Sequence, residues 1–309
     1  MSRGHGPAIG EAGDTLRRTL SPEVLIMQRV LVLSFVLFVS TVGAAFAQQT
    51  DADKEYVESM GREHTGDTPV ANPMSEGAAG EVVTKTVEYA SLDGTAVSGH
   101  LAMPADGKPS AAMIVIHEWW GLNDNVRAMA EKLAAEGYAA LAVDLYEGEV
   151  ASDRDGAMTL VRAAQGRGER LEENLRQARA WLGDTLGVDK VGVIGWCFGG
   201  GWALRTGLSQ GDAIDATVIY YGRLVTDAAE LAPITSPVLG IFGAEDGGIP
   251  VDSVMAFETA MKEAGKSAAI HIYDGADHAF ANPSGTRYNA EAAEDAWAKT
   301  VAFLAENLQ

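Results

Sequence analysis

The stretch Val191-Gly-Val-Ile-Gly-Trp-Cys-Phe-Gly-Gly-Gly201 decides how this chain folds, and it contains the only cysteine of the sequence. Apolar residues lead into Gly195 and small residues follow Phe198, so the pattern predicts a buried strand, a sharp turn and the start of a helix. In such a turn the central residue, Cys197, is held in a strained conformation with its side chain above the sheet. Glycine is needed two residues before and after it, because a Cβ there would collide with the neighbouring strand or helix. The pattern therefore predicts a thiol presented as a nucleophile.

Cys197 also has an ordinary structural interpretation, because a free cysteine usually behaves as a small buried hydrophobic residue. The flanking glycines and the strand-to-helix context favour the nucleophile. The backbone at Cys197 lies at a predicted helix N-terminus, where the dipole and the free N–H groups favour thiolate over thiol. A dinucleotide-binding loop is excluded, because no G-x-G-x-x-G pattern fits the glycines between Gly192 and Gly201.

Residues 1–47 have the pattern of an N-terminal extension followed by a secretory signal peptide. Met27-Gln-Arg29 is a basic start, an apolar run follows from Val30 to Val42, and Ala45-Phe-Ala47 is an A-x-A cleavage site. The run is shorter than the roughly 20 residues that span a bilayer. We expect cleavage after Ala47, export to the periplasm or the medium, and no stable membrane insertion afterwards; the alternative is an uncleaved anchor. Residues 1–26 have no core pattern, so either Met27 is the true start or the basic region is unusually long.

The rest of the composition indicates an acidic protein with one folded domain. The formal net charge is −20, and such a surface repels nucleic acid and anionic membranes. Residues 48–80 are rich in Asp, Glu, Thr, Gly and Pro with little periodicity, which predicts a flexible polar lead-in. Residues 81–309 suit a single α/β domain. Exported proteins commonly pair their cysteines in disulfides, so a solitary thiol is a liability unless it is buried or needed, and its position in the turn indicates that it is needed.

Residues 81–309 alternate short apolar runs with helical patterns. Two β-prone segments, Glu81 to Ala90 and Thr95 to Met103, flank the hairpin signal Ser91-Leu-Asp-Gly94. Six further runs are typical of strands buried on both faces of a sheet: 112–116, 139–143, 190–194, 216–221, 238–242 and 269–273. Six helices are expected between and after them: 125–136, 156–164, 169–182, 200–209, 252–264 and 290–307. This alternation predicts an α/β fold with a mostly parallel central sheet and helices on both faces.

Four loops place reactive side chains directly after predicted strands, namely Glu118, Cys197, Asp246 and His278. In an open parallel sheet, functional groups gather at the carboxyl ends of the strands. A thiol nucleophile needs a base, which His278 supplies, and the imidazole needs an acid to fix its tautomer, for which Asp246 fits. The chain order of nucleophile, acid and histidine is that of α/β-hydrolase scaffolds. Asp277 is the alternative acid, although adjacent loop residues rarely face each other.

Acyl transfer also needs N–H donors for the developing oxyanion. The backbone of Phe198, the residue after the nucleophile, supplies one, and Trp119 in the loop after the first parallel strand is the expected second. His117-Glu118 does not start a zinc motif, because H-E-x-x-H needs histidine where Gly121 stands. The other histidines, at positions 5, 64, 100 and 271, form no ligand cluster in the sequence. We therefore predict neither a metal ion nor a cofactor.

These residues resemble the dienelactone hydrolase family, whose members have a cysteine nucleophile on the α/β-hydrolase fold. The resemblance covers about residues 82–307 and rests on five motifs: Glu118-Trp-Trp-Gly121, Asp144-Leu-Tyr146, Gly195-Trp-Cys-Phe-Gly-Gly200, Tyr220-Tyr-Gly222 and Asp277-His-Ala-Phe280. It implies Cys197 as nucleophile with His278 and Asp246 as its partners. It also implies that the Glu118 carboxylate holds the resting thiol until a substrate displaces it.

The substrate side departs from the family pattern. Dienelactone-cleaving members resemble one another in an arginine four residues after the histidine, where this chain has Asn282. Arg154 corresponds loosely to a second substrate arginine of the family, and Arg287 is an alternative clamp if its placement allows bidentate binding. The aromatic side chains suggest an apolar substrate pocket, although aromatic residues near a sheet are more often part of the core. The expected apolar contacts are Trp119, Trp120, Trp196, Tyr221 and Phe280, and the expected polar contacts are Arg154 and Asn282.

The sequence thus predicts an exported hydrolase that cleaves a small carboxylic ester or lactone through a cysteine acyl-enzyme. A non-catalytic ligand-binding or thiol redox-sensing protein on the same scaffold is the alternative. A peptidase is disfavoured, because no lid or propeller domain is visible in the sequence. The natural substrate and the oligomeric state are not predicted.

Overall fold

The computed structural model describes residues 54–69 and 81–309, which belong to one compact unit. The predicted signal peptide and its cleavage site lie outside these residues. Within residues 54–69, the structure shows a helix at 54–63 and the turn that follows it.

The centre of the molecule is an eight-stranded sheet in the order β1-β2-β4-β3-β5-β6-β7-β8. Its strands are β1 Val82–Leu92, β2 Thr95–Pro104, β3 Ala112–Ile116, β4 Ala139–Val143, β5 Val191–Trp196, β6 Ala216–Tyr220, β7 Val238–Gly243 and β8 Ala268–Tyr273. Strands β3 to β8 pair in parallel, whereas β1 pairs antiparallel with β2 and β2 antiparallel with β4. The predicted fold class, a mostly parallel sheet of the α/β-hydrolase kind, is confirmed.

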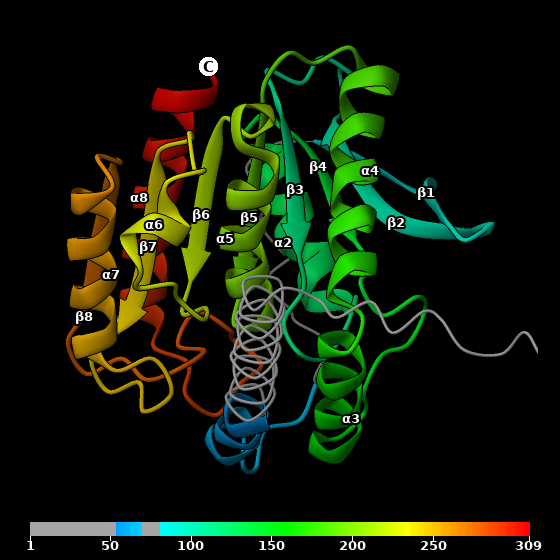
Figure 1. The fold of residues 1–309 in the computed structure, drawn as a ribbon. Coiled ribbons are helices and arrows are strands. Elements are labelled where there is room, and N and C mark those ends of the chain that lie inside the picture. The colour runs from blue at the N-terminus through cyan, green and yellow to red at the C-terminus, as the bar shows by residue number, and fades with distance from the viewer. Residues whose placement is uncertain (1–53, 70–80) are drawn as a thin grey trace, which may run out of the picture. The chain divides into compact units, whose positions relative to one another are not determined.

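Helices cover both faces of this sheet (Figure 1). They are α2 Asp124–Ala135, α3 Arg154–Gln165, α4 Gly168–Leu186, α5 Phe198–Gln210, α6 Ala228–Leu231, α7 Val251–Glu263 and α8 Ala290–Leu308, with a 3₁₀ turn at Gly211–Ala213. Helices α4 and α5 contact each other and lie on one face, whereas α2 packs on β2, β3 and β4, and α8 on β5, β6 and β7. The short helix α6 and the 3₁₀ turn are the two elements of residues 81–309 that the sequence patterns do not predict.

The apolar runs form strands because the sheet interior is covered from both sides. Every residue of β3, β4, β5, β6 and β7 is buried, so no alternation of polar and apolar residues is required there. The edge strand β8 is only partly buried. Asp93 and Gly94 form the turn of the first hairpin with φ of 50° and 81°, and positive φ at both central residues is what a two-residue type I′ turn needs.

Residues 54–69 differ from the flexible segment that the sequence analysis predicts for 48–80. Residues 54–63 are helical, and the side chains of Val57 and Met60 are only 1% and 2% exposed. Both belong to the main hydrophobic core. The physical reason is a short apolar stripe, since positions 57, 60 and 64 recur at the spacing of one helix face. The polar composition around that stripe masks it.

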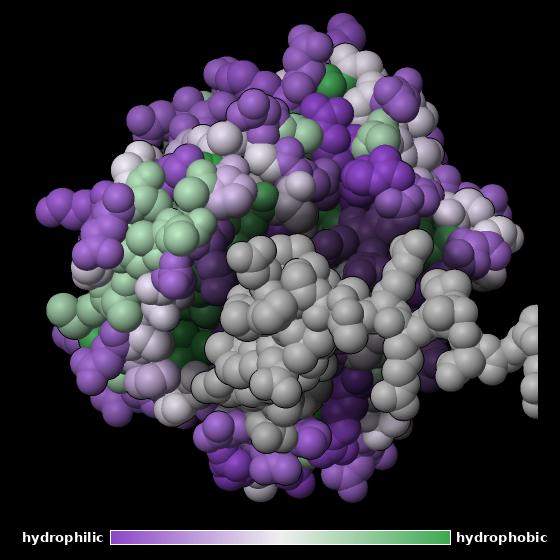
Figure 2. All heavy atoms as spheres, viewed as in Figure 1, coloured by the Kyte–Doolittle hydropathy of each residue, from purple (hydrophilic) through white to green (hydrophobic). Residues whose placement is uncertain are grey.

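The surface is mainly polar on the face shown in Figure 2, with a greener area on the side where α7 lies. Met255 of this helix is 56% exposed. Among the residues that the structure describes, no helix is long and apolar enough to cross a membrane.

Candidate active site

The turn between β5 and α5 holds Cys197 in an unusual backbone conformation. Its φ and ψ are 54° and −116°, a region that residues other than glycine rarely adopt. A Cβ on Gly195 would lie 2.1 Å from the carbonyl oxygen of Gly199, and one on Gly199 would lie 2.4 Å from that of Ile116. Both glycines are therefore required for the backbones to approach this closely. The predicted strand, turn and helix are present as expected.

The Cys197 thiol is buried, with 1% of the residue exposed. Burial raises the pKa of the thiol, and the neighbouring His278 and the Phe198 N–H oppose this rise without cancelling it. The helix N-terminus does act on the sulfur through Phe198, but desolvation outweighs it. Burial thus opposes the preference for the thiolate that the helix N-terminus gives.

His278 lies beside the thiol and is held by Asp246. The His278 Nδ1 is 2.8 Å from Asp246 Oδ2, and Asp246 Oδ1 accepts hydrogen bonds from the backbone N–H groups of Gly248 and Ile249. Burial alone lowers the pKa of His278, but Cys197 and Asp246 raise it well above its ordinary value. Asp277 accepts from the backbone N–H of His278 instead of binding the ring. The geometry thus favours Asp246 over Asp277 as the acid.

A second histidine–aspartate pair approaches the same sulfur from residues 54–69. His64 Nε2 is 3.7 Å from Cys197 Sγ, and His64 Nδ1 is 2.8 Å from Asp67 Oδ2. Burial lowers the pKa of His64 to about 4 although Asp67 opposes the shift, so the ring is neutral near pH 7. The prediction that His64 belongs to no ligand cluster is wrong, because His64 lies together with Cys197 and His278. The available signals were the H-x-x-D spacing and the apolar stripe that continues to position 64.

Arg287 and Thr286 connect this second pair to the rest of the domain through hydrogen bonds. Arg287 Nη2 donates to Asp67 Oδ2 at 2.8 Å, and Thr286 donates to Asp67 Oδ1 through its backbone N–H and its hydroxyl. The His64 ring also stacks on Trp119, with 4.3 Å between the ring centroids. Because Arg287 is hydrogen-bonded to Asp67, it is not free to bind a substrate carboxylate.

Glu118 lies in the loop after β3, where His117 and Asn282 position it. The His117 Nδ1–H donates to the Glu118 carbonyl oxygen at 2.6 Å while His117 Nε2 accepts from the Leu145 N–H. Asn282 Nδ2 donates to Glu118 Oε2 at 2.5 Å. Burial raises the pKa of Glu118 to about 7. His64 Nε2 contacts the sulfur as well, and the Glu118 carboxylate is held by Asn282, which stands at the position of the family's arginine.

The aromatic candidates pack on His64, on His278 or on other aromatic rings, whereas Arg154 binds elsewhere. Trp119 and Trp120 are buried and pack on each other, and the Tyr221 ring lies 5.2 Å from His278 and 5.6 Å from Phe280. Arg154 donates to the backbone carbonyl of Gly61. Its guanidinium therefore holds residues 54–69 and does not contact the thiol.

Several buried polar atoms around the thiol have no hydrogen-bond partner among the described residues. They are Glu118 Oε1, Trp119 Nε1, Tyr221 OH, His278 Nε2 and Arg287 Nε. Such groups are uncommon in folded proteins, and their convergence marks a site where a polar ligand or water is bound.

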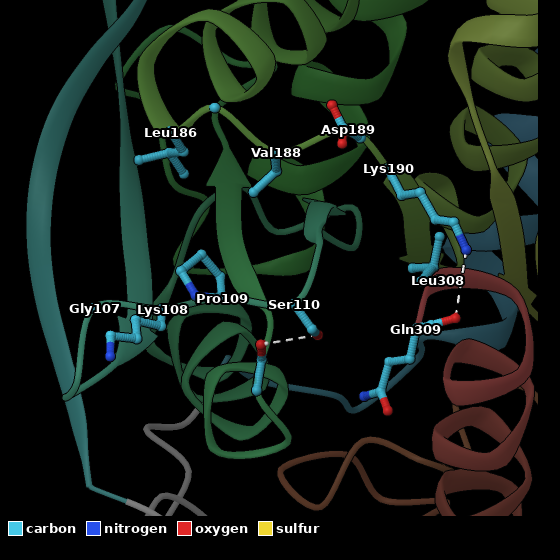
Figure 3. Close-up of a pocket in the computed structure, with 12 residues that line it drawn as sticks. Gly107, Lys108, Pro109, Ser110, Leu186, Val188, Asp189, Lys190, Leu308 and Gln309 are labelled. Carbon is cyan, nitrogen blue, oxygen red and sulfur yellow. Dashed lines mark hydrogen bonds between the residues drawn. The ribbon is translucent and has the colours of Figure 1, made fainter.

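The space beside these groups is small. A cavity of about 20 Å³ is lined by Glu118, Asn125, Val126, Met129, Trp196, Tyr221, Ala281, Asn282 and Pro283. A much larger cavity, about 770 Å³, is shown in Figure 3. It is lined by residues that precede β3 and β5, such as Ser110 and Lys190, and therefore lies at the amino edge of the sheet. The reactive groups lie at the opposite, carboxyl edge.

Two groups of side chains have metal-ligating atoms close together in the described part of the chain. One is His64, Cys197 and His278, all buried, and the other is Glu63, Asp246 and His278. In the second group Asp246 already occupies His278 Nδ1. No cofactor-binding loop of the glycine-rich kind accompanies either group in the sequence.

A mostly parallel sheet with a strained Cys197 turn after β5, an aspartate after β7 and a histidine after β8 has the arrangement of the α/β-hydrolase fold. Comparison with known proteins narrows this class. The profile of the dienelactone hydrolase family matches residues 97–308. This chain belongs to the dienelactone hydrolase family, as its motifs indicate.

Individual relatives agree with this assignment. A putative carboxymethylenebutenolidase of Saccharolobus solfataricus is 33% identical over 249 residues, covering 69% of this chain and 95% of that protein. The structure of a putative dienelactone hydrolase from Klebsiella pneumoniae superposes with a TM-score of 0.65 at 27% identity, covering 73% of this chain and 99% of that one. A dienelactone hydrolase-like promiscuous phosphotriesterase from metagenomic libraries gives 0.68 at 25% identity, covering 74% and 100%.

Proposed function

We propose that this protein hydrolyses a carboxylic ester or lactone through a thioester formed on Cys197. The observation that carries the proposal is the convergence of the strained Cys197 turn with a buried Asp246–His278 pair whose Nε2 has no other partner among the described residues. A nucleophile, a base and an acid that orients the base are the minimum set for acyl transfer. Membership of the dienelactone hydrolase family supports the same reaction class.

In the proposed reaction the imidazole of His278 takes the proton of the Cys197 thiol as the sulfur attacks the substrate carbonyl carbon. The charge that develops on the carbonyl oxygen is stabilised by the backbone N–H groups of Phe198 and Trp119. The C–O bond to the leaving group then breaks, and His278 returns the proton to the leaving oxygen. In the second half, His278 removes a proton from water, hydroxide attacks the thioester, and the thiol leaves with that proton.

Asp246 keeps His278 in the tautomer with its proton on Nδ1 and stabilises the imidazolium that forms in each half-reaction. Its two backbone hydrogen bonds and the lowered pKa of its carboxyl fit this role. We assign Glu118 to the restraint of the resting thiol, by analogy with the family. His64 and Asp67 are not part of this catalytic set.

The substrate we propose is a small, apolar ester or lactone without an obligatory carboxylate. Asn282 is bound to Glu118, and both candidate arginines, Arg154 and Arg287, are bound to residues 54–69. None of these three is thus available as a free carboxylate clamp. Because Cys197 is 1% exposed and the adjoining cavity is small, side chains over the thiol must move before substrate binds.

We also propose that the protein is exported after cleavage behind Ala47, which rests on the sequence pattern of residues 27–47 alone. N-terminal sequencing of the protein from the culture or periplasmic fraction tests this. A mature chain that begins well upstream of Gln48 would contradict it.

Hydrolysis of a panel of activated esters and lactones by the wild-type and Cys197→Ala proteins tests the reaction. We expect Cys197→Ala to lose turnover and mass spectrometry to detect an acyl adduct on Cys197 of the wild type. Full activity in Cys197→Ala would overturn the mechanism. Reversible sulfenylation of Cys197 without hydrolysis of any substrate would instead favour the redox-sensing alternative.

A further inference from the structure

Three ligand-type atoms converge on one point in the buried site. His64 Nε2, Cys197 Sγ and an imidazole nitrogen of His278 all lie within 4.8 Å of one another, and the sulfur is 3.7 Å from His64 Nε2. All three residues are buried, at 1%, 1% and 2% exposure. Zinc bonds to cysteine and histidine are about 2.0–2.3 Å long, so small side-chain movements bring all three atoms to one ion.

Both histidines are arranged as metal ligands usually are. Each ring binds an aspartate through Nδ1 at 2.8 Å, His64 through Asp67 and His278 through Asp246. This leaves the lone pair of each Nε2 directed away from its aspartate. Metal-bound histidines almost always donate the other ring N–H to a carboxylate or carbonyl, which fixes the tautomer.

A further observation points to a missing ligand at this place. His278 Nε2 is buried and has no hydrogen-bond partner among the described residues. The competing cluster of Glu63, Asp246 and His278 does not explain this atom, because there His278 Nδ1 is the nitrogen that faces the carboxylates.

We propose that His64, Cys197 and His278 form a binding site for Zn²⁺. On binding, the thiol releases its proton to solvent, a zinc–sulfur bond forms, and the two Nε2 atoms donate their lone pairs. Three protein ligands leave a fourth tetrahedral position for water. Two nitrogen ligands and one sulfur ligand suit zinc, whereas Mg²⁺ and Ca²⁺ prefer oxygen.

Zinc at this position would inhibit the enzyme reversibly. This consequence alone rests on the proposed function, because the ion occupies both the nucleophile and the base of that mechanism. Cys197 and His278 lie in the region that matches the family, residues 97–308, whereas His64 lies outside it. The third ligand is thus supplied by the N-terminal segment of this chain.

Titration of the full protein with Co²⁺, followed by displacement with Zn²⁺, tests the site without a substrate. We expect a near-ultraviolet sulfur-to-cobalt absorption band and visible bands typical of tetrahedral cobalt. Because the sequence has a single cysteine, the sulfur band reports on Cys197. No such band, or bands of an octahedral ion with oxygen ligands, would overturn the proposal.

Single substitutions then test whether the zinc site has three protein ligands or only two. His64→Leu should weaken zinc binding by about 100-fold or more, and Asp67→Asn, which removes the support of one ligand, by about 10- to 100-fold. His100→Leu is the matched control, because His100 pairs with Glu131 on α2 and lies outside the cluster. Equal zinc affinity in wild type and His64→Leu would overturn the three-ligand site.

Inhibition assays distinguish failure of this proposal from failure of the proposed function. We expect Zn²⁺ to inhibit ester hydrolysis by the wild type, and His64→Leu to hydrolyse esters within about tenfold of the wild-type rate while resisting zinc. If Cys197→Ala retained hydrolysis, the acyl-enzyme mechanism would fail while the cobalt result still stood. If zinc inhibited both proteins equally, the zinc site would fail while the mechanism stood.

Discussion

Two aspartate–histidine pairs of nearly the same geometry flank one thiol, and they have different origins. The Asp246–His278 pair follows strands β7 and β8, whereas the Asp67–His64 pair comes from a helix and turn before the sheet begins. Both have a 2.8 Å contact between Nδ1 and a carboxylate oxygen. The same side-chain geometry therefore does not by itself assign a role, and the two pairs differ in the backbone that holds them.

The two pairs are supported by different forces. Backbone atoms of neighbouring strands and loops confine the sheet-derived pair, as the close approach of Gly243 to the carbonyl of Ala276 shows. Side-chain contacts hold the other pair, chiefly those of Arg287 and Thr286 to Asp67. We therefore expect changes near the sheet to be costly and changes in residues 54–69 to be tolerated.

The largest expected difference is in catalysis. Asp246→Asn should lower kcat/KM by about 10³- to 10⁴-fold, because an amide oxygen cannot stabilise the imidazolium and the amide N–H favours the wrong tautomer. Asp67→Asn should lower it by less than about tenfold, because His64 is not the base. Steady-state kinetics on one activated ester measure both. Equal losses would show that the two pairs act together in turnover.

The next difference is in stability. Gly199→Ala places a Cβ 2.4 Å from the backbone oxygen of Ile116, and a clash with backbone should cost about 3 kcal/mol or more. Gly61→Ala meets only the flexible ends of two side chains, Met158 at 2.6 Å and Arg154 at 3.3 Å. Alanine also favours the helix by about 1 kcal/mol, so Gly61→Ala should be nearly neutral.

Urea unfolding of both variants beside the wild type measures this pair of substitutions. A Gly199→Ala protein with a wild-type midpoint would show that the turn can relax. A Gly61→Ala protein as unstable as Gly199→Ala would show that residues 54–69 are as rigidly confined as the nucleophile turn.

The sheet-derived half of the site is predictable from the sequence for a physical reason. Strands buried on both faces leave continuous apolar runs, and reactive residues directly after those runs must gather at one edge. Cys197, Asp246 and His278 are found in this way, and the predicted runs 112–116 and 139–143 coincide with β3 and β4. The close approaches that require Gly195 and Gly199 are visible in the same pattern.

The other half of the site, the Asp67–His64 pair, is not predictable by the same reasoning. His64 and Asp67 lie in a segment whose composition is polar, and the burial of Val57 and Met60 depends on a surface that other elements supply. Arg287 is more than 200 residues away from Asp67 in the chain, so no local pattern connects them. The burial that raises the pKa of Cys197 is likewise a tertiary property, which the predicted helix N-terminus does not reveal.

Glu118 tests the electrostatic link between the two regions, because His278, Asp67 and Arg287 all act on its carboxyl. Its pKa is raised from 4.5 to about 7, mainly by burial. The folded protein therefore holds a proton that the unfolded chain releases between pH 4.5 and 7, and this contribution to stability is lost as pH rises through that window. Glu118→Gln should remove the dependence.

The size of this effect is at most about 3 kcal/mol, since one pKa unit corresponds to about 1.4 kcal/mol. Urea unfolding at several pH values from 4.5 to 8 measures the free energy of unfolding of Glu118→Gln and of the wild type. The effect is the change with pH in the difference between these two free energies. Glu291→Gln, exposed in the first turn of α8, is the control. A constant difference across the series would contradict the raised pKa.

The smallest expected effect concerns how firmly residues 54–69 are attached. Arg287→Met removes the charged hydrogen bond to Asp67 and the 3.0 Å contact between Arg287 Nη2 and His64 Nδ1, but leaves the bonds from His64 and Thr286 to Asp67. A charge-assisted bond of this kind contributes about 2 kcal/mol, so local opening of the segment should become roughly 30-fold more frequent. Hydrogen exchange of the amides in residues 54–69, read by mass spectrometry, measures that opening directly. Arg176→Met, which removes an exposed pair with Glu173 on α4, should leave it unchanged. If Arg287→Met also left exchange unchanged, the burial of Val57 and Met60 would by itself hold the Asp67–His64 pair in place. The two pairs would then differ in origin but not in how rarely their surroundings open.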